Sequence, residues 1–178
     1  MPIPTLLNMT NEALDQEFDR LFREHSHLVY RTAYSVTGSP QDAEDVLQAI
    51  FLGFLRRGFP PGLSENPKGY LYRAAINLSL NTVRSRQRHI ATSEAGRLNA
   101  HAETNRAEAE VDLERRLVNA LAQLNPRAVE MLILRYEHNH TEAEIGKLLG
   151  TSRGVVAVTL YRARTRLKKL LRASGEMS

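Results

Sequence analysis

The sequence contains no cysteine, which excludes both a disulfide framework and a zinc site built from thiolates. This absence is typical of proteins that work in a reducing compartment, so we expect a cytoplasmic location. No apolar run approaches the length of a membrane-spanning helix, and residues 1–16 lack the basic start and apolar stretch of a signal peptide. We therefore expect no membrane insertion.

The motifs of several enzyme classes are also missing. The sequence has no Gly-rich phosphate loop, no nucleophile elbow and no Ser/His/Asp order on a strand scaffold. The pairs His25/His27 and His138/His140 have the spacing of metal ligands, but no cysteine or nearby carboxylate pair completes a site. We expect these histidines in exposed loops or on the surface, and we predict no catalytic residue, no metal and no cofactor.

Charge is unevenly distributed along the 178 residues. Residues 1–66 hold nine acids and five bases, residues 67–90 hold five bases and no acid, and residues 127–178 hold ten bases and five acids. Basic segments suit contacts with phosphates, because such contacts release counterions and steer the encounter. The acidic first block requires a different partner. With 42% hydrophobic residues the chain can bury a core.

The apolar residues recur with the period of a helix, and no segment clearly predicts a strand. Helices are expected over 12–36, from 40 to a loop at 58–62, over 67–88, 111–124 and 126–136, and in two further segments near the C-terminus. Ser39 is expected to cap the second helix, and Leu55 and Leu78 are expected on the buried apolar faces of the second and third helices. Residues 154–159 are rich in β-branched side chains, which favour a strand, but the surrounding caps and apolar pattern favour a helix. The fold class is therefore all-α.

We predict two small helical domains joined by a flexible linker. The first spans residues 1–90, the linker 91–112 and the second 113–178. The linker is polar and rich in alanine, and it lacks a sustained apolar stripe.

Residues 141–172 have the helix caps and the turn glycine expected of a helix-turn-helix. Thr141 and Glu144 have the spacing of a capping box, Gly150 supplies a left-handed residue after the first helix, and Ser152 can cap the second. Gly146 is small enough to let the two helices cross closely. In a DNA-binding helix-turn-helix the second helix enters the major groove. The alternative is an ordinary helical hairpin.

Three segments together resemble a bacterial sigma factor of the extracytoplasmic-function group in the sigma-70 family. They are TGSPQDAEDVLQAIFLGFL (37–55), NPKGYLYRAAINLSLNTVRSRQR (66–88), and ALAQLNPRAVEMLILRY (120–136) followed by the helix-turn-helix. The resemblance covers about residues 18–172. It implies a protein that binds core RNA polymerase, recognises promoter DNA and promotes transcription initiation, with an anti-sigma factor as a further partner.

The acidic start of the second expected helix is the candidate polymerase site. Its members are Asp42, Glu44, Asp45 and Gln48. Asp42, Asp45 and Gln48 are spaced at i, i+3 and i+6, so they share a face of the helix. The resemblance implies that this segment meets the coiled-coil clamp of the largest polymerase subunits. The alternative is that the carboxylates only stabilise the helix N-terminus.

The loop before the third helix, and that helix itself, correspond to the family segment that opens the upstream promoter element. The candidate DNA-binding residues are Phe59, Tyr70, Arg73, Asn77, Arg84, Arg86 and Arg88. Strand opening needs cations for phosphates and aromatic surfaces for an unstacked base, and an asparagine can pair with a base edge. For Tyr70 and for its neighbour Tyr72, ordinary core packing is an equal alternative.

The reading helix of the C-terminal block departs from the family pattern. The family commonly presents Lys, Ser and Arg where this chain has Ala157, Val158 and Thr159. The candidate DNA contacts are Arg153, Thr159, Tyr161, Arg162 and Arg164. With few charges at its tip, this block is expected to bind DNA weakly by itself.

Two other functions compete with a sigma factor. One is a sigma-like decoy or regulator that binds an anti-sigma factor rather than DNA. The other is a stand-alone helix-turn-helix repressor, which leaves the acidic second helix unexplained.

Overall fold

A computed structural model of the chain describes residues 11–93 and 106–175, and within these ranges the regular structure is entirely helical. The described helices are α1 (Asn11–Thr37), α2 (Pro40–Arg57), α3 (Pro61–Glu65), α4 (Pro67–Ser93), α5 (Arg106–Ala122), α6 (Pro126–Tyr136), α7 (Glu142–Leu149) and α8 (Arg153–Gly175). The predicted all-α fold class is confirmed. None of these helices is both long and apolar enough to cross a membrane.

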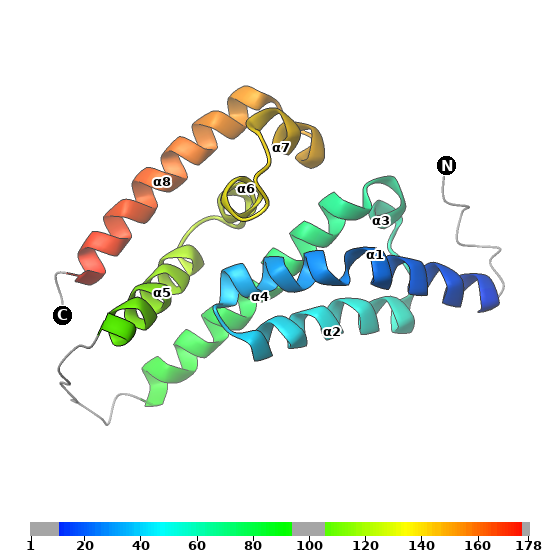
Figure 1. Ribbon diagram of the computed structural model, residues 1–178, viewed down its shortest axis with the longest axis horizontal. Helices are drawn as coiled ribbons and strands as arrows, with labels where there is room; N and C mark the ends of the chain where they lie inside the picture. Colours follow the sequence, from blue (N-terminus) through cyan, green and yellow to red (C-terminus); the bar gives the residue numbers. More distant parts are fainter. Residues whose placement is uncertain (1–10, 94–105, 176–178) are drawn as a thin grey trace.

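The first three long helices lie alongside one another and form one helical group (Figure 1). Gly38 adopts a left-handed conformation (φ +62°) between α1 and α2, and the Ser39 hydroxyl accepts a hydrogen bond from the Asp42 N–H at 3.2 Å. The predicted cap at Ser39 is confirmed. The core of this group is aliphatic and aromatic, with Val29, Ala33, Val46, Phe51, Leu71 and Ala75 among its buried members.

The helix-turn-helix is present with the caps that its sequence predicts. Thr141 and Glu144 form a reciprocal capping box, Gly150 is left-handed (φ +63°), and the Ser152 hydroxyl accepts from the Val155 N–H at 3.2 Å. The hydrogen bonds from Thr141 lower the pKa of the Glu144 carboxyl. Residues 154–159 are helical, so the local propensity for a strand is overridden by the caps and by packing.

Several local expectations differ from the structure. Pro61 and Gly62, expected in a loop, belong to the short helix α3. Leu78 was expected in the core of the third helix, but its side chain is 37% exposed, and Ile76 and Leu80 are buried instead. The expected linker, 91–112, begins inside α4 and ends inside α5, and its residues 94–105 lie outside the described residues.

Helices α5 to α8 form a second helical group, which is not separate in space from the first. Helix α4 packs against α5, α6 and α7 as well as against α1, α2 and α3. Tyr72, Ile76 and Leu80 of α4 share one buried cluster with residues of the second group, including Leu121, Met131 and Leu134. One continuous apolar core therefore joins the two halves of the chain.

Polar contacts border this shared core. Arg31 of α1 forms an ion pair of 2.6 Å with Glu137, and the ring of His138 lies 3.0 Å from the Thr32 hydroxyl. The His138 ring also meets the Tyr72 ring edge-on, with centroids 4.8 Å apart. Burial, aided by the charge of Arg31, lowers the pKa of His138 to about 4. The expectation of an exposed His138 is therefore wrong, because tertiary packing places this loop against α1 and α4.

His25 also differs from the expectation of a surface histidine, because its side chain is buried on α1. Burial lowers its pKa. Its neighbour His27 is exposed, as expected.

Gly146 allows α7 to lie close to the turn that follows it and to the first residue of α8. The Thr151 N–H donates to the Gly146 carbonyl at 2.8 Å, so the chain folds back directly over this residue. A Cβ at position 146 would lie 2.8 Å from the Thr151 carbonyl oxygen and 3.3 Å from the Arg153 nitrogen. A larger residue therefore has to displace the backbone of the turn.

We expect Gly146→Ala to lower the free energy of unfolding by about 1–3 kcal/mol, the usual cost of overpacking. Gly154→Ala is the matched control, because the nearest atom to its added Cβ is the Ser152 hydroxyl at 3.9 Å. That change should leave stability unchanged or raise it by about 0.5–1 kcal/mol through helix propensity. Urea unfolding followed by circular dichroism measures both, and equal effects would contradict the steric role of Gly146.

Candidate nucleic-acid interface

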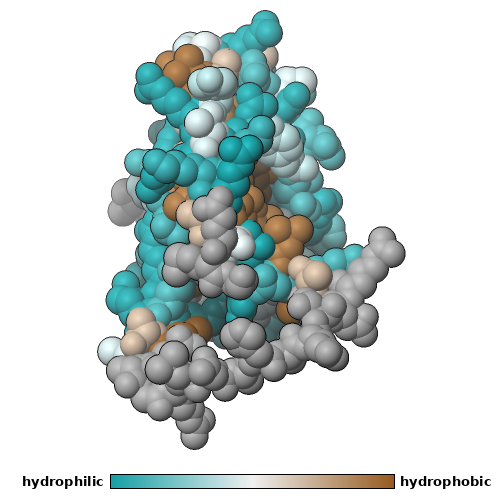
Figure 2. Space-filling view, turned by 90° about the vertical axis from the view of Figure 1, so that its left-hand side faces the viewer, coloured by the Kyte–Doolittle hydropathy of each residue, from teal (hydrophilic) through white to brown (hydrophobic). Residues whose placement is uncertain are grey.

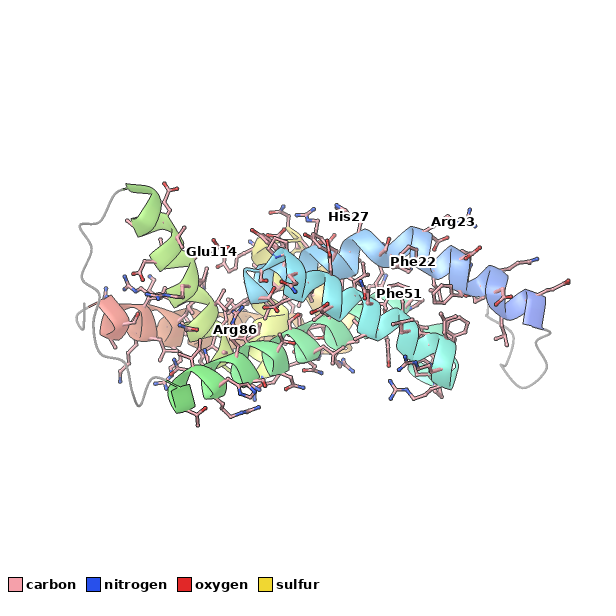
Figure 3. The ribbon with its side chains drawn as sticks, turned by 90° about the horizontal axis from the view of Figure 1, so that it is seen from below. Phe22, Arg23, His27, Phe51, Arg86 and Glu114 are labelled. Carbon is pink, nitrogen blue, oxygen red and sulfur yellow. The ribbon has the colours of Figure 1, made fainter. Side chains whose placement is uncertain are left out.

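The acidic residues predicted on the second helix lie at the N-terminal end of α2. Glu44, Asp45 and Gln48 are exposed, and Glu44 and Asp45 form no ion pair within the described residues. Asp42 differs, because its carboxylate accepts from the Arg86 guanidinium of α4 at 2.8 Å. Figure 3 labels Arg86 on α4. Three of the four predicted residues are thus free to meet a partner.

The outward face of α2 continues from these polar residues into apolar ones, a feature that sequence reasoning missed. Leu52 and Leu55 are 44% and 55% exposed, although Leu55 was expected in the core. Phe22 of α1 is 41% exposed and meets the Phe51 ring edge-on at 5.0 Å (Figure 3). The available signal was the spacing of Gln48, Leu52 and Leu55, which places them on one helical face.

An aromatic pocket lies between the C-terminal end of α2 and the first turns of α4. Its volume is about 530 Å³, and Phe59, Tyr70 and Asn77 all line it. Three of the residues predicted to act on the upstream element are therefore brought to one place. Arg57 also lines the pocket, and the sequence argument did not single it out. Tyr72 lies elsewhere: it is buried in the shared core, where burial raises its pKa to about 12.

Arg73 lies on α4 at the junction with α6. Its guanidinium is 3.6 Å from the carboxylate of Glu130, which is only 3% exposed. Arg127 forms a closer ion pair with the same carboxylate, at 2.8 Å. The Glu130 Oε1 atom is buried and has no hydrogen-bond partner among the described residues. Asn77 lines the small cleft at this junction as well as the aromatic pocket.

The remaining predicted arginines of α4 are not equivalent. Arg84 donates to the carbonyl oxygens of Ala122 and Leu124, at 2.9 and 3.2 Å, and so ties α4 to the end of α5. Arg86 binds Asp42 and also donates to the Thr37 carbonyl at 3.2 Å. Arg88 is exposed, and its side chain forms no ion pair within the described ranges.

The reading helix α8 presents a mixed surface. Arg153 is exposed and lies 3.7 Å from Glu142, Thr159 is half-buried, and Tyr161 is 66% exposed. Arg162 is exposed, and Arg164 donates to the Tyr136 hydroxyl at 3.2 Å.

Apolar side chains also reach the surface of α8. Val155 and Val158 are 51% and 49% exposed. They share one face of the helix with Tyr161, because the three positions are spaced at i, i+3 and i+6. Methyl groups on such a face can contact the methyl group of thymine.

An apolar groove of about 550 Å³ lies where the end of α1 meets α5, α6 and α8. Leu117, Leu121, Ile133 and Leu167 are among its lining residues, with Glu114 and Lys168 at its edges. Figure 2 views this end of the molecule and shows hydrophobic surface in its middle, between hydrophilic flanks. The sequence pattern did not predict this groove, because its walls come from both halves of the chain.

The described residues contain no group of three or more histidine, cysteine or acidic side chains placed to hold a metal ion.

Two family models match the chain. Sigma-70 region 2 matches residues 21–89, and sigma-70 region 4 matches residues 114–167.

Curated relatives match across both regions. The chain is 32% identical to the RNA polymerase sigma factor CarQ of Myxococcus xanthus over 158 residues, covering 86% of this chain and 88% of CarQ. It is 32% identical to the ECF RNA polymerase sigma factor SigE of Mycolicibacterium smegmatis, covering 90% of this chain and 64% of SigE. It is 30% identical to the ECF sigma factor BldN of Streptomyces coelicolor, covering 86% and 60%. The chain thus spans less than two thirds of the length of SigE and BldN.

A solved structure shares the fold. The sigma factor RpoE from Bartonella quintana, crystallised with the anti-sigma factor NepR, is 22% identical, with a TM-score of 0.52. The match covers 88% of this chain and 98% of that one.

We expect Arg84→Ala to lower the free energy of unfolding by about 1–3 kcal/mol, because hydrogen bonds from a charged donor to two carbonyl groups are lost. Arg88→Ala is the control on the same helix, and a change of an exposed side chain should stay within about 0.5 kcal/mol. Denaturant unfolding of both variants gives the comparison. A loss no larger for Arg84 than for Arg88 would mean that the contacts with α5 contribute nothing.

Proposed function

The chain belongs to the extracytoplasmic-function group of the sigma-70 family. We propose that it binds core RNA polymerase, recognises promoter DNA and promotes transcription initiation. The observation that carries the proposal is the convergence of Phe59, Tyr70 and Asn77 on one pocket in a chain that also holds a helix-turn-helix. In this proposal, residues 1–90 contact polymerase and the upstream element, residues 91–112 link the halves, and residues 113–178 contact duplex DNA.

Polymerase binding is assigned to the outward face of α2. Exposed Glu44, Asp45 and Gln48 offer acidic and polar groups to a basic partner, and Leu52 and Leu55 extend the surface with apolar area. Charge complementarity of this kind steers the encounter and sets the register, while burial of the leucines adds affinity. Asp42 takes part in this surface only by giving up its ion pair with Arg86.

Strand opening is assigned to the aromatic pocket. Removing a base from a duplex costs a few kcal/mol, and stacking on an aromatic side chain returns about 1–3 kcal/mol per base. Phe59 and Tyr70 supply the stacking surfaces, and the Asn77 amide reads the base edge. Arg73, Arg84, Arg86 and Arg88 act on the phosphates. Arg84 does so only after it leaves the carbonyl groups of Ala122 and Leu124, and Arg86 only after it leaves Asp42.

The reading helix contributes duplex recognition through Arg153, Thr159, Tyr161, Arg162 and Arg164, with methyl contacts from Val155 and Val158. The second half binds DNA weakly by itself, because the tip of the reading helix, at Ala157, Val158 and Thr159, presents no charge to the DNA major groove. If the two halves separate from their shared core on polymerase, their connection through residues 91–112 keeps the second site at an effective concentration in the millimolar range.

The proposal includes no catalytic step by this chain. Bond formation belongs to the polymerase, and the chain acts in the cytoplasm, where polymerase and DNA are present, without a cofactor.

A sigma-like regulator that binds an anti-sigma factor instead of DNA is the second candidate. Two observations favour an anti-sigma partner: the apolar groove between α1, α5, α6 and α8, and the engagement of Arg73 and Arg84 by the second half of the chain. The five bases at 67–90 favour DNA binding. Transcription in vitro with core polymerase on a genomic library separates the two, because a regulator that does not bind DNA yields no specific transcripts.

We expect Asp45→Arg to weaken co-purification with core polymerase at least about tenfold, since like charges at an interface cost several kcal/mol. Asp15→Arg is the matched charge reversal, because Asp15 is an exposed carboxylate of a different helix, α1. Circular dichroism should show both variants folded. If Asp45→Arg retains core polymerase as well as the unaltered chain does, the acidic residues at the start of α2 only stabilise the helix N-terminus and do not bind polymerase.

We expect Asn77→Ala to change base preference at one position of the upstream element, because a good amide–base pair discriminates by about 1–3 kcal/mol. Arg88→Ala should weaken all promoters alike and lower the salt dependence of binding. Transcription from a promoter library measures both. If Asn77→Ala also weakens every sequence equally, its reading role is refuted.

A further inference from the structure

Arg57 is the charged residue of the aromatic pocket. The other lining residues are aromatic, aliphatic, glycine and proline, together with the amide of Asn77, and no carboxylate lines the pocket. The Arg57 side chain forms no hydrogen bond or ion pair with any of the described residues. Arg73, Arg84 and Arg86, in contrast, all have partners. A positive group therefore stands at this pocket without a protein anion to neutralise it.

Gly53 gives the Arg57 side chain its position. The guanidinium folds back one turn along α2, and a Cβ at position 53 would lie 3.0 Å from its Nη2 atom. A Cβ at position 53 would therefore require the end of the flexible Arg57 side chain to shift by a few tenths of an ångström. Helix propensity disfavours glycine in the interior of α2, so the lack of a side chain here has a local cost. Arg56, the preceding residue, is also exposed but does not line the pocket.

A nucleotide is the ligand that matches this combination of groups. The cavity of about 530 Å³ falls in the usual range for small-molecule sites, roughly 300–1,000 Å³. Phe59 and Tyr70 offer stacking surfaces for a base, but neither they nor Asn77 neutralises the phosphate attached to it. An arginine guanidinium binds phosphate oxygens through two parallel hydrogen bonds, with geometric as well as electrostatic specificity.

We propose that Arg57 binds the backbone phosphate of the nucleotide whose base enters the aromatic pocket, and that Gly53 leaves room for its guanidinium beside α2. This inference rests on the proposed function, since it assumes that the pocket receives promoter DNA. It adds Arg57 as a residue that positions the single DNA strand. The phosphate contact holds the sugar while Phe59 and Tyr70 hold the base, so that a base already unpaired is kept out of the duplex.

The test uses holoenzyme assembled from core polymerase and the full chain. Its probe is a single-stranded oligonucleotide that carries the non-template upstream element of a promoter found by transcription on a genomic library. A series of oligonucleotides replaces one phosphate at a time with a neutral methylphosphonate. For the unaltered chain, we expect one replacement beside the extruded base to weaken binding about tenfold, as for the loss of one charged hydrogen-bonded contact.

Arg57→Ala should weaken binding of the unmodified oligonucleotide by a similar factor and should then be insensitive to that one replacement. The slope of log affinity against log salt should fall by about 0.7, the value for one single-strand phosphate contact. Arg56→Ala is the control, which should keep both the affinity and the sensitivity.

Full sensitivity to the same methylphosphonate in Arg57→Ala would overturn the proposal, as would equal losses for Arg56→Ala and Arg57→Ala. These outcomes are distinct from failure of the proposed function. If Phe59→Ala and Asn77→Ala also leave oligonucleotide binding unchanged, the pocket itself does not receive DNA. If those two weaken binding and Arg57→Ala does not, only the phosphate contact is refuted.

Discussion

The packing of α4 against both halves of the chain is the constraint on which the rest of the structure depends. Along this helix, Leu71 and Ala75 face the core of α1 and α2, while Tyr72, Ile76 and Leu80 enter the cluster shared with α6 and α8. A single helix that is buried on two sides has only a narrow strip left for solvent. Asn77 lies on that strip, and Phe59 and Tyr70 reach the same pocket from the α2–α4 loop and the start of α4.

The packing of α4 also decides which of its arginine side chains are available to contact DNA. Arg73 and Arg84 lie on the side that meets the second half of the chain, where they bind Glu130 and the carbonyl groups at the end of α5. A carboxylate buried as deeply as Glu130 is costly without a cationic partner, so Arg127 and Arg73 stabilise it together. Arg73 is 57% exposed, so its guanidinium can meet a phosphate on one side while it stays beside Glu130 at the junction between α4 and α6.

Local rules accounted for the segments whose hydrogen bonds close within a few residues. The Ser39 cap, the Thr141–Glu144 capping box and the left-handed Gly150 were all predicted, because each depends only on neighbours in sequence. Errors arose where a side chain could face either core or solvent. Leu55 and Leu78 have helical spacing that fits an apolar stripe, and yet both are exposed, since the neighbouring helices cover a different arc. His138 was misplaced for the opposite reason, because its loop is buried by residues about 106 positions away.

The sequence by itself determined the helices other than the short α3, several of their caps, the helix-turn-helix and the family, because periodicity, capping and motif spacing are properties of contiguous residues. It also named Phe59, Tyr70 and Asn77 as candidate DNA contacts. Only the tertiary structure decided that these three share one pocket with Arg57, that Arg84 and Arg86 already have partners, and that the two halves share a core. The physical reason is that such relations depend on which helix faces pack together, and the free energy of that packing is shared among residues far apart in the chain.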